Sequence, residues 1–232
     1  PKTSFAIIDA VVPDKNVASL MFKSEQSSYL AGVAAAKQTK SNTVGFIGGV
    51  HGDIIDTFEA GFIAGVKATN PDIKIMTQYA DSFTDAAKGK TIAASMIAVG
   101  ADVIFQAAGG TGSGVFAEAK ATDQKLAADS DKKVWVIGVD MDQKRDGDYT
   151  DKDNKKSNFT LVSAVKRVDN AVESLTNQGR EGKFPGGKTI TYGLKEKGVG
   201  LAKDSASPEV WSAVEAAQKK IIAGDIKVPV HP

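Results

Sequence analysis

The sequence contains no cysteine, only two histidines and no hydrophobic run of the roughly 18 residues that would suggest a membrane-spanning helix. Without cysteine, disulfide bonds, thiol nucleophiles and thiolate zinc sites are excluded. The histidines, His51 and His231, lie too far apart in sequence to indicate a metal site or a proton relay by themselves. Basic and acidic residues nearly balance, 29 against 28, so no concentration of positive charge points to nucleic acid as a partner.

What is present is the composition of a folded α/β protein. The chain has 232 residues, of which 42% are hydrophobic, enough for one large α/β domain or two smaller ones. Short β-branched runs alternate with longer runs of helical period, the pattern of βα units that build a parallel sheet. This pattern predicts helices starting near residues 26, 54, 84 and 112. It predicts strands over residues 5–9, 17–22, 43–47, 73–78, 102–106 and 133–139.

The last third of the chain is patterned differently. Residues 142–158 are rich in Asp, Lys, Asn and Gly and predict a solvated loop. A helix with one apolar face is expected from about Val165, followed by a strand over residues 188–194. The final helix, 208–223, has the clearest start, since Ser207 is a typical N-cap and is followed by proline and glutamate.

A glycine-rich loop over residues 109–114 follows a predicted strand and opens a predicted helix. Backbone N–H groups at such a helix start can hold an anion or a polar ligand. Gly112, Gly114 and Ala117 also satisfy a relaxed form of the dinucleotide-binding fingerprint, and Asp140 ends the next strand where a ribose-binding acid would stand. The loop therefore has three interpretations: a dinucleotide site, a different ligand-facing loop, or a tight turn alone.

Three further side chains are candidates for ligand contact. Asp140 ends a predicted strand, the edge at which open α/β sheets bind ligands, and a carboxylate there can accept hydrogen bonds from sugar hydroxyls. Lys166 is expected at the start of a helix, where it could reach a polar ligand or simply be solvated. Phe83 lies in a polar loop after a strand, where it could stack on a planar ligand or act as a hydrophobic staple for the next helix.

Nothing in the sequence assembles a catalytic or metal-binding set. The acidic stretch from Asp146 to Asp153 lacks the glycine and the final glutamate of a calcium loop. There is no Gly-x-Ser-x-Gly elbow and no P-loop, and the histidines offer no evident base. Ligand binding is therefore favoured over catalysis, with no cofactor and no metal expected.

Several long runs, in this order along the chain, closely resemble the basic membrane protein family, whose members are nucleoside-binding lipoproteins of ABC importers. The resemblance covers nearly the whole chain. The runs are FKSEQSSYLAG (22–32), VGFIGG (44–49), FEAGFIAGVK (58–67), AAGGTG (107–112) and VIGVDMDQ (136–143).

The resemblance implies a type I periplasmic-binding-protein fold, with two α/β lobes of parallel sheets flanked by helices and a ligand cleft between them. Residues 1–25 and 165–187 would then be what remains of lobe one. Residues 26–164 and 188–232 would form a nearly complete lobe two. On this interpretation the chain is a fragment that lacks the signal peptide, the lipidated cysteine and most of lobe one.

The resemblance also implies roles for individual residues. Asp140 and Lys166 would hydrogen-bond the ribose, Phe83 would stack on the base, and Gly110 would offer a backbone contact. Gln26 is also predicted to contact the ligand, although it stands where many members have Glu, so a carboxylate-specific contact is not expected there. The expected ligand is a nucleoside, with purine favoured over pyrimidine. The expected partner is a membrane ABC permease, and the expected location is the outer face of the cytoplasmic membrane or the periplasm, through a lipid anchor.

Two other functions remain as alternatives. One is an NAD(P)-dependent oxidoreductase that uses the 109–114 loop as its dinucleotide site. The other is a ligand-sensing regulatory protein of the same fold, whose partner would be another protein and not a permease.

Overall fold

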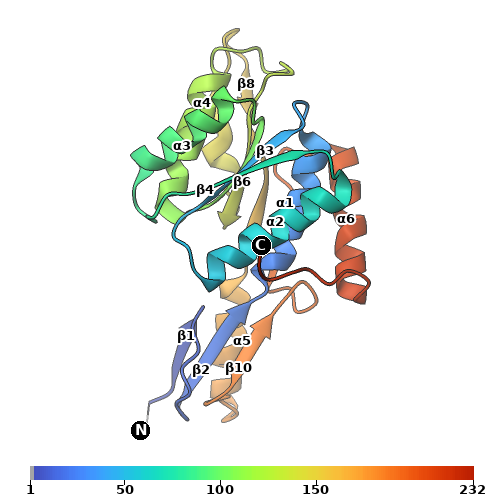
Figure 1. Ribbon diagram of the computed structural model, residues 1–232. Helices are drawn as coiled ribbons and strands as arrows, with labels where there is room; N and C mark the ends of the chain where they lie inside the picture. The colour runs from blue at the N-terminus through green and yellow to red at the C-terminus, as the bar shows by residue number, and fades with distance from the viewer. Residues whose placement is uncertain (1–2) are drawn as a thin grey trace.

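The computed structural model describes residues 3–232, and its strands form two main sheets of very different size. A six-stranded sheet with its helices makes up the upper part of the view in Figure 1, and a three-stranded sheet with one helix makes up the lower part. We call these the large region and the small region. The chain passes between them more than once, so neither region is one continuous segment.

The large sheet has the strand order β11-β9-β6-β5-β3-β4, and its strands are parallel except for β11, which runs antiparallel to β9. Its central strands are almost entirely buried, as expected for a parallel sheet covered on both faces. The strands are β3 (Thr43–Gly48), β4 (Lys74–Tyr79), β5 (Val103–Ala107), β6 (Trp135–Asp140), β9 (Thr160–Lys166) and β11 (Val199–Ala202).

Helices cover both faces of this sheet and divide its core into two clusters. Side chains of α1, α2 and α6 pack into one cluster, and side chains of α3 and α4 into the other. Helices α1 and α2 approach very closely: a Cβ on Gly65 would lie 2.0 Å from the carbonyl oxygen of Tyr29. The helices are α1 (Ser24–Gln38), α2 (Asp53–Thr69), α3 (Ala86–Ala98), α4 (Gly112–Asp123) and α6 (Pro208–Ala223).

The small region consists of β1 (Phe5–Ile8), β2 (Val17–Phe22), β10 (Thr189–Tyr192) and α5 (Val168–Arg180). Strand β2 lies between the other two and pairs with both in parallel. Helix α5 runs alongside β2 and β10 (Figure 1), and its Ala171 and Leu175 are buried in the same cluster as Leu20 of β2. The edge strands β1 and β10 stay largely exposed.

The structure confirms the six strands predicted up to residue 139, the strand near residue 190 and the final helix, 208–223. The helix predicted from Val165 is wrong at its start. Residues 160–166 form β9, in the middle of the large sheet, and α5 begins only at Val168. Val165 and Lys166 therefore end a strand, and Val172, on α5, is 44% exposed. The β-branched run was short enough to fit either element, and its neighbours β6 and β11 decided the outcome.

The segment 142–158 is only partly the solvated loop that its composition predicts. It contains a short 3-10 helix, η2 (Lys144–Gly147), and a hairpin of β7 (Asp148–Thr150) and β8 (Lys156–Asn158). Tyr149 and Asp151 are buried within it. The carboxylate of Asp151 accepts hydrogen bonds from three backbone N–H groups, which explains why so polar a segment has a defined shape.

Residues 188–232 were predicted to belong together to lobe two, but the strands within them pair with two different sheets. Strand β10 pairs with β2 and belongs to the small sheet, whereas β11 and α6 pack with the large region. A segment boundary drawn at residue 188 therefore separates β10 from the sheet that contains it. The register of β10 beside β2 depends on contacts between residues about 170 positions apart in sequence, which no local pattern reveals.

Candidate functional site

A cavity of about 220 Å³ lies where the small region meets the carboxyl edge of the large sheet. Loops that follow parallel strands converge at this edge, which is the usual ligand position in open α/β sheets. One wall is apolar and is formed by the first turns of α2, while the other carries charged side chains. The lining residues are Asp9, Ile54, Ile55, Phe58, Phe83, Ala107, Gly109, Val139, Asp140 and Lys166.

Lys166 links the two regions at the polar wall. Its Nζ lies 2.6 Å from Asp9 Oδ2, at the end of β1, and 3.8 Å from Asp140 Oδ1, at the end of β6. The lysine side chain is only 12% exposed, whereas the Asp140 side chain is 58% exposed. The ammonium group therefore holds two carboxylates at the cavity, one from each region, and leaves Asp140 open to solvent or ligand.

Both aspartates adopt a left-handed backbone conformation, with φ of 58° at Asp9 and 65° at Asp140. This conformation is uncommon for residues other than glycine, although aspartate tolerates it better than most. Asp9 Oδ1 is buried and has no hydrogen-bond partner among the described residues. Buried acceptors are normally satisfied, so the Asp9 carboxylate, which lines the cavity, has spare acceptor capacity there.

Phe83 lies in the loop between β4 and α3, lines the cavity and is 44% exposed. The hydrophobic-staple alternative for this residue is wrong. Helix α3 is capped by Asp85, whose carboxylate accepts from Lys88 N at 2.9 Å, so the staple position belongs to Thr84. Helix packing does not account for the exposed ring, which is free to contact a ligand.

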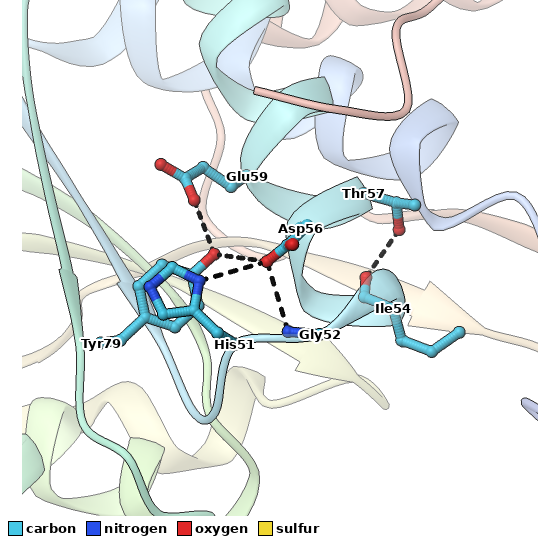
Figure 2. A network of polar contacts seen from close by, with 7 residues as sticks. All are labelled: His51, Gly52, Ile54, Asp56, Thr57, Glu59 and Tyr79. Atoms are coloured by element: carbon cyan, nitrogen blue, oxygen red, sulfur yellow. Dashed lines mark hydrogen bonds and ion pairs between the residues drawn. The ribbon is translucent and has the colours of Figure 1, made fainter.

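The apolar wall is held in place by polar contacts on the other side of α2, drawn in Figure 2. The hydroxyl of Tyr79, at the end of β4, donates to Glu59 Oε2 at 2.6 Å and lies 3.2 Å from Asp56 Oδ1. The imidazole of His51 stacks on the Tyr79 ring (Figure 2). Burial, reinforced by the Glu59 carboxylate, raises the pKa of Tyr79, so the hydroxyl remains a donor. These contacts fix the helical turns that carry Ile55 and Phe58.

The other two predicted site residues are placed differently. Gly110 does not line the cavity, although its neighbour Gly109 does, in a left-handed conformation with φ of 56°. Gln26 lies on α1, and its Oε1 accepts a hydrogen bond from Leu194 N at 2.8 Å. This glutamine therefore connects α1 to the chain after β10 and does not face the cavity.

The glycine-rich loop is built for close packing, which argues against the dinucleotide interpretation. Gly112 N already donates to the carbonyl oxygens of Gly109 and Gly110, and Thr111 N donates to those of Ala108 and Phe83, so these groups are not free to bind phosphate. A Cβ on Gly112 would lie 1.9 Å from Gln106 Oε1, and one on Gly114 would lie 1.8 Å from the carbonyl oxygen of Ala86. These two glycines are thus explained by contacts with β5 and α3.

Sequence reasoning missed Asp9, Ile54 and Ile55 as cavity residues. The signal for Asp9 was available, because Asp9, like Asp140, stands at the carboxyl end of a predicted strand. The isoleucines had no such signal, since one apolar pair near a helix start looks the same whether it faces a core or a cavity. Phe58 is only 3% exposed, as a core residue is, and also borders the cavity.

Residues 3–232 contain no group of three or more His, Asp or Glu side chains arranged to hold a metal ion. None of the helices described is both long and apolar enough to span a bilayer.

The two regions, with a cavity at the carboxyl edge of a parallel sheet, have the architecture of the periplasmic-binding-protein class. The fold is similar to that of an ABC transporter solute-binding protein from Aeropyrum pernix, with a TM-score of 0.80 and 26% identity, covering 97% of this chain and 71% of that one. The chain belongs to the PnrA-like (Bmp) family of ABC transporter substrate-binding proteins, whose sequence profile matches residues 1–231. This is a family of transport components and not of enzymes.

Curated relatives point to the same family by sequence identity. The chain is 54% identical over 231 residues to the ABC transporter nucleoside-binding protein BmpA of Lactococcus lactis, and 53% identical over 235 residues to the CD4+ T-cell-stimulating antigen of Listeria monocytogenes. These matches cover 99% and 100% of this chain. The chain spans 65% of the length of each of these relatives.

Proposed function

We propose that the protein captures nucleosides in the cavity between its two regions, as the substrate-binding component of an ABC importer. The observation that carries this proposal is the pairing of an aromatic and aliphatic wall with a carboxylate-lined end in one cavity. A nucleoside has the matching chemistry, because its base is planar and its ribose carries neighbouring hydroxyl groups.

The ribose is assigned to the polar end. Vicinal hydroxyls can donate to Asp140, whose side chain is exposed, and to the carboxylate of Asp9, whose Oδ1 has no hydrogen-bond partner within residues 3–232. Lys166 stays between the carboxylates and can donate to a ribose oxygen. The base is assigned to the apolar end, where Phe83 offers a ring face for stacking and α2 offers aliphatic side chains. Gly110 would contribute only backbone, and Gln26 is left out of the site.

The relative from Lactococcus lactis, which is named as nucleoside-binding, supports the choice of ligand. We further infer a purine preference, an ABC permease as partner and a lipid-anchored location on the outer face of the cytoplasmic membrane or in the periplasm. The small and large regions would be the two lobes, with the boundaries corrected so that β10 belongs to the small one. Ligand capture would then close the lobes on each other.

Calorimetric titration with inosine, 2′-deoxyinosine, uridine and NAD tests this proposal. We expect saturable binding of inosine, weaker binding of 2′-deoxyinosine and none of NAD. The variant Asp140→Ala should weaken inosine binding by about 5- to 150-fold, the range expected when one partner of a buried hydrogen bond is removed.

Asp81→Ala is the matched control. Asp81 also follows a strand and has a positive φ of 52°, but its side chain is 73% exposed and does not line the cavity. Its loss should leave the affinity unchanged. Unaltered binding by Asp140→Ala would refute the assigned site, and binding of NAD alone would favour the oxidoreductase instead.

A further inference from the structure

Two buried or half-buried glutamines, Gln106 and Gln143, connect two of the loops that line the cavity. We propose that Gln106 is a positioning residue that acts through Gln143 to hold Asp140 in its ligand-facing conformation. The inference rests on the proposed function only for its ligand, because the contacts themselves lie within the protein.

Gln106 is fully buried on β5, next to the loop that carries Gly109. Its Oε1 lies under that loop, 3.4 Å from Ala108 N, in space that a Cβ on Gly112 would otherwise fill. Its Nε2 donates to Gln143 Oε1 at 2.8 Å. One amide group therefore contacts both the loop after β5 and the loop after β6, which contribute Gly109 and Asp140 to the cavity.

Gln143 transmits this contact to the turn that contains Asp140. Its Oε1 also accepts from Val139 N at 2.8 Å, directly before Asp140, and its own backbone N donates to Ser163 Oγ at 3.0 Å. The turn is closed by Met141 N, which donates to the carbonyl oxygen of Val139 at 2.8 Å. Gln143 thus fixes the turn on both sides of Asp140, before it through the side-chain contact with Val139 and after it through its own backbone N–H.

A fixed turn is needed because Asp140 has a positive φ of 65° and its side chain is 58% exposed, so packing of that side chain does not hold it in place. A non-glycine residue keeps such a backbone conformation only when its surroundings determine it. Neither glutamine lines the cavity. Their contribution to binding would therefore pass through the backbone of the 139–143 turn and not through contact with the ligand.

The variant Gln106→Met tests this role, because methionine has a similar volume but cannot donate to Gln143. We expect inosine affinity to fall about tenfold, which corresponds to the loss of one hydrogen bond that orients a binding group. The preference for inosine over 2′-deoxyinosine should shrink with it. Gln78→Met, a glutamine on the exposed part of β4, is the matched control and should leave both quantities unchanged.

A double-mutant cycle separates positioning from general destabilisation. In an Asp140→Ala background, Gln106→Met should cause no further loss of affinity, because the residue that it positions is already gone. A further tenfold loss in that background would overturn the proposal, as would unchanged affinity and discrimination in the single variant.

Hydrogen exchange of the ligand-free protein supplies a readout that does not depend on nucleoside binding. In Gln106→Met the amide of Val139 should exchange faster, while amides in β2 keep the wild-type rate. Unchanged protection at Val139 would refute the positioning role. If the wild-type protein binds no nucleoside at all, the proposed function fails, and exchange at Val139 still decides this inference.

Discussion

The small and large regions use the same kind of strand in different ways. In the large sheet, β5 is buried along its whole length, with helices on both faces. In the small sheet only β2 is buried to a comparable degree, while β1 carries Phe5 at 54% exposure. The large region therefore has one core cluster to itself, under α3 and α4, whereas the buried side chains of β2 and α5 belong to a cluster shared with α1, α2 and α6. The ion pair of Lys166 with Asp9 is a further link between the two regions.

This difference suggests a division of roles. The large region supplies a rigid edge at which loops hold Gly109, Asp140 and the apolar wall of α2. The small region supplies Asp9 from an exposed edge strand.

The largest expected effect is on the free energy of unfolding, when one phenylalanine from each region is replaced by alanine. Phe105 is fully buried in β5, so Phe105→Ala should lower the free energy of unfolding by about 3–5 kcal/mol through the cavity that it leaves. Phe5→Ala should change it by no more than about 0.5 kcal/mol, because that ring is already half exposed. Chemical denaturation of both variants is the measurement. Equal losses would show that the small region is as tightly packed as the large one.

The second effect is a dependence of stability on pH within the large region. Asp123, at the end of α4, is fully buried, and its Oδ2 has no hydrogen-bond partner among the described residues. Burial raises the pKa of this carboxyl from 3.8 to about 7. The folded state therefore holds the proton more tightly than the unfolded state, and stability falls as the pH rises from about 4 to about 7.

Asp123→Asn should remove this dependence, so the variant should gain about 2–4 kcal/mol relative to wild type between pH 5 and pH 8. Asp151→Asn is the control, because the pKa of Asp151 is shifted in the opposite direction to that of Asp123. Backbone hydrogen bonds, that from Lys155 first, lower the pKa of Asp151, so its contribution is present above the ordinary carboxyl pKa and is lost only in acid. Its variant should be less stable than wild type by a constant amount across that range. Thermal unfolding at several pH values checks both, and a constant difference for Asp123→Asn would contradict the assignment.

The smallest expected effect on stability comes from replacing two tyrosines, each at the end of an edge strand, by phenylalanine. Tyr79→Phe, in the large sheet, removes the donor to Glu59 and should cost about 1–2 kcal/mol, because that carboxylate is only 9% exposed. Tyr192→Phe, in the small sheet, should be nearly neutral. The Tyr192 ring stacks on Phe22, and its hydroxyl makes no hydrogen bond within residues 3–232. Differential scanning calorimetry of the pair is sufficient, and a neutral Tyr79→Phe would show that the contacts in Figure 2 do not anchor α2.

Much of the candidate site was predictable. Asp140, Phe83 and Lys166 were proposed from their positions after strands or from the family resemblance, and the structure brings all three to one cavity. Lys166 was assigned to a helix, yet it ends β9, because pairing with β6 and β11 outweighed the helical spacing of its valines. Gln26 was misplaced because a family position does not reveal which neighbour a side chain meets.

The sequence by itself determined the order of most strands and helices, since apolar period and capping residues act over a few positions. It also determined the family to which the chain belongs, and it excluded thiol chemistry. Only the tertiary structure decided that β10 joins β2, that Asp9 meets Lys166 from 157 residues away, and that a buried glutamine links two ligand-facing loops. These contacts form between distant segments whose approach depends on the packing of the whole chain, which no local pattern encodes.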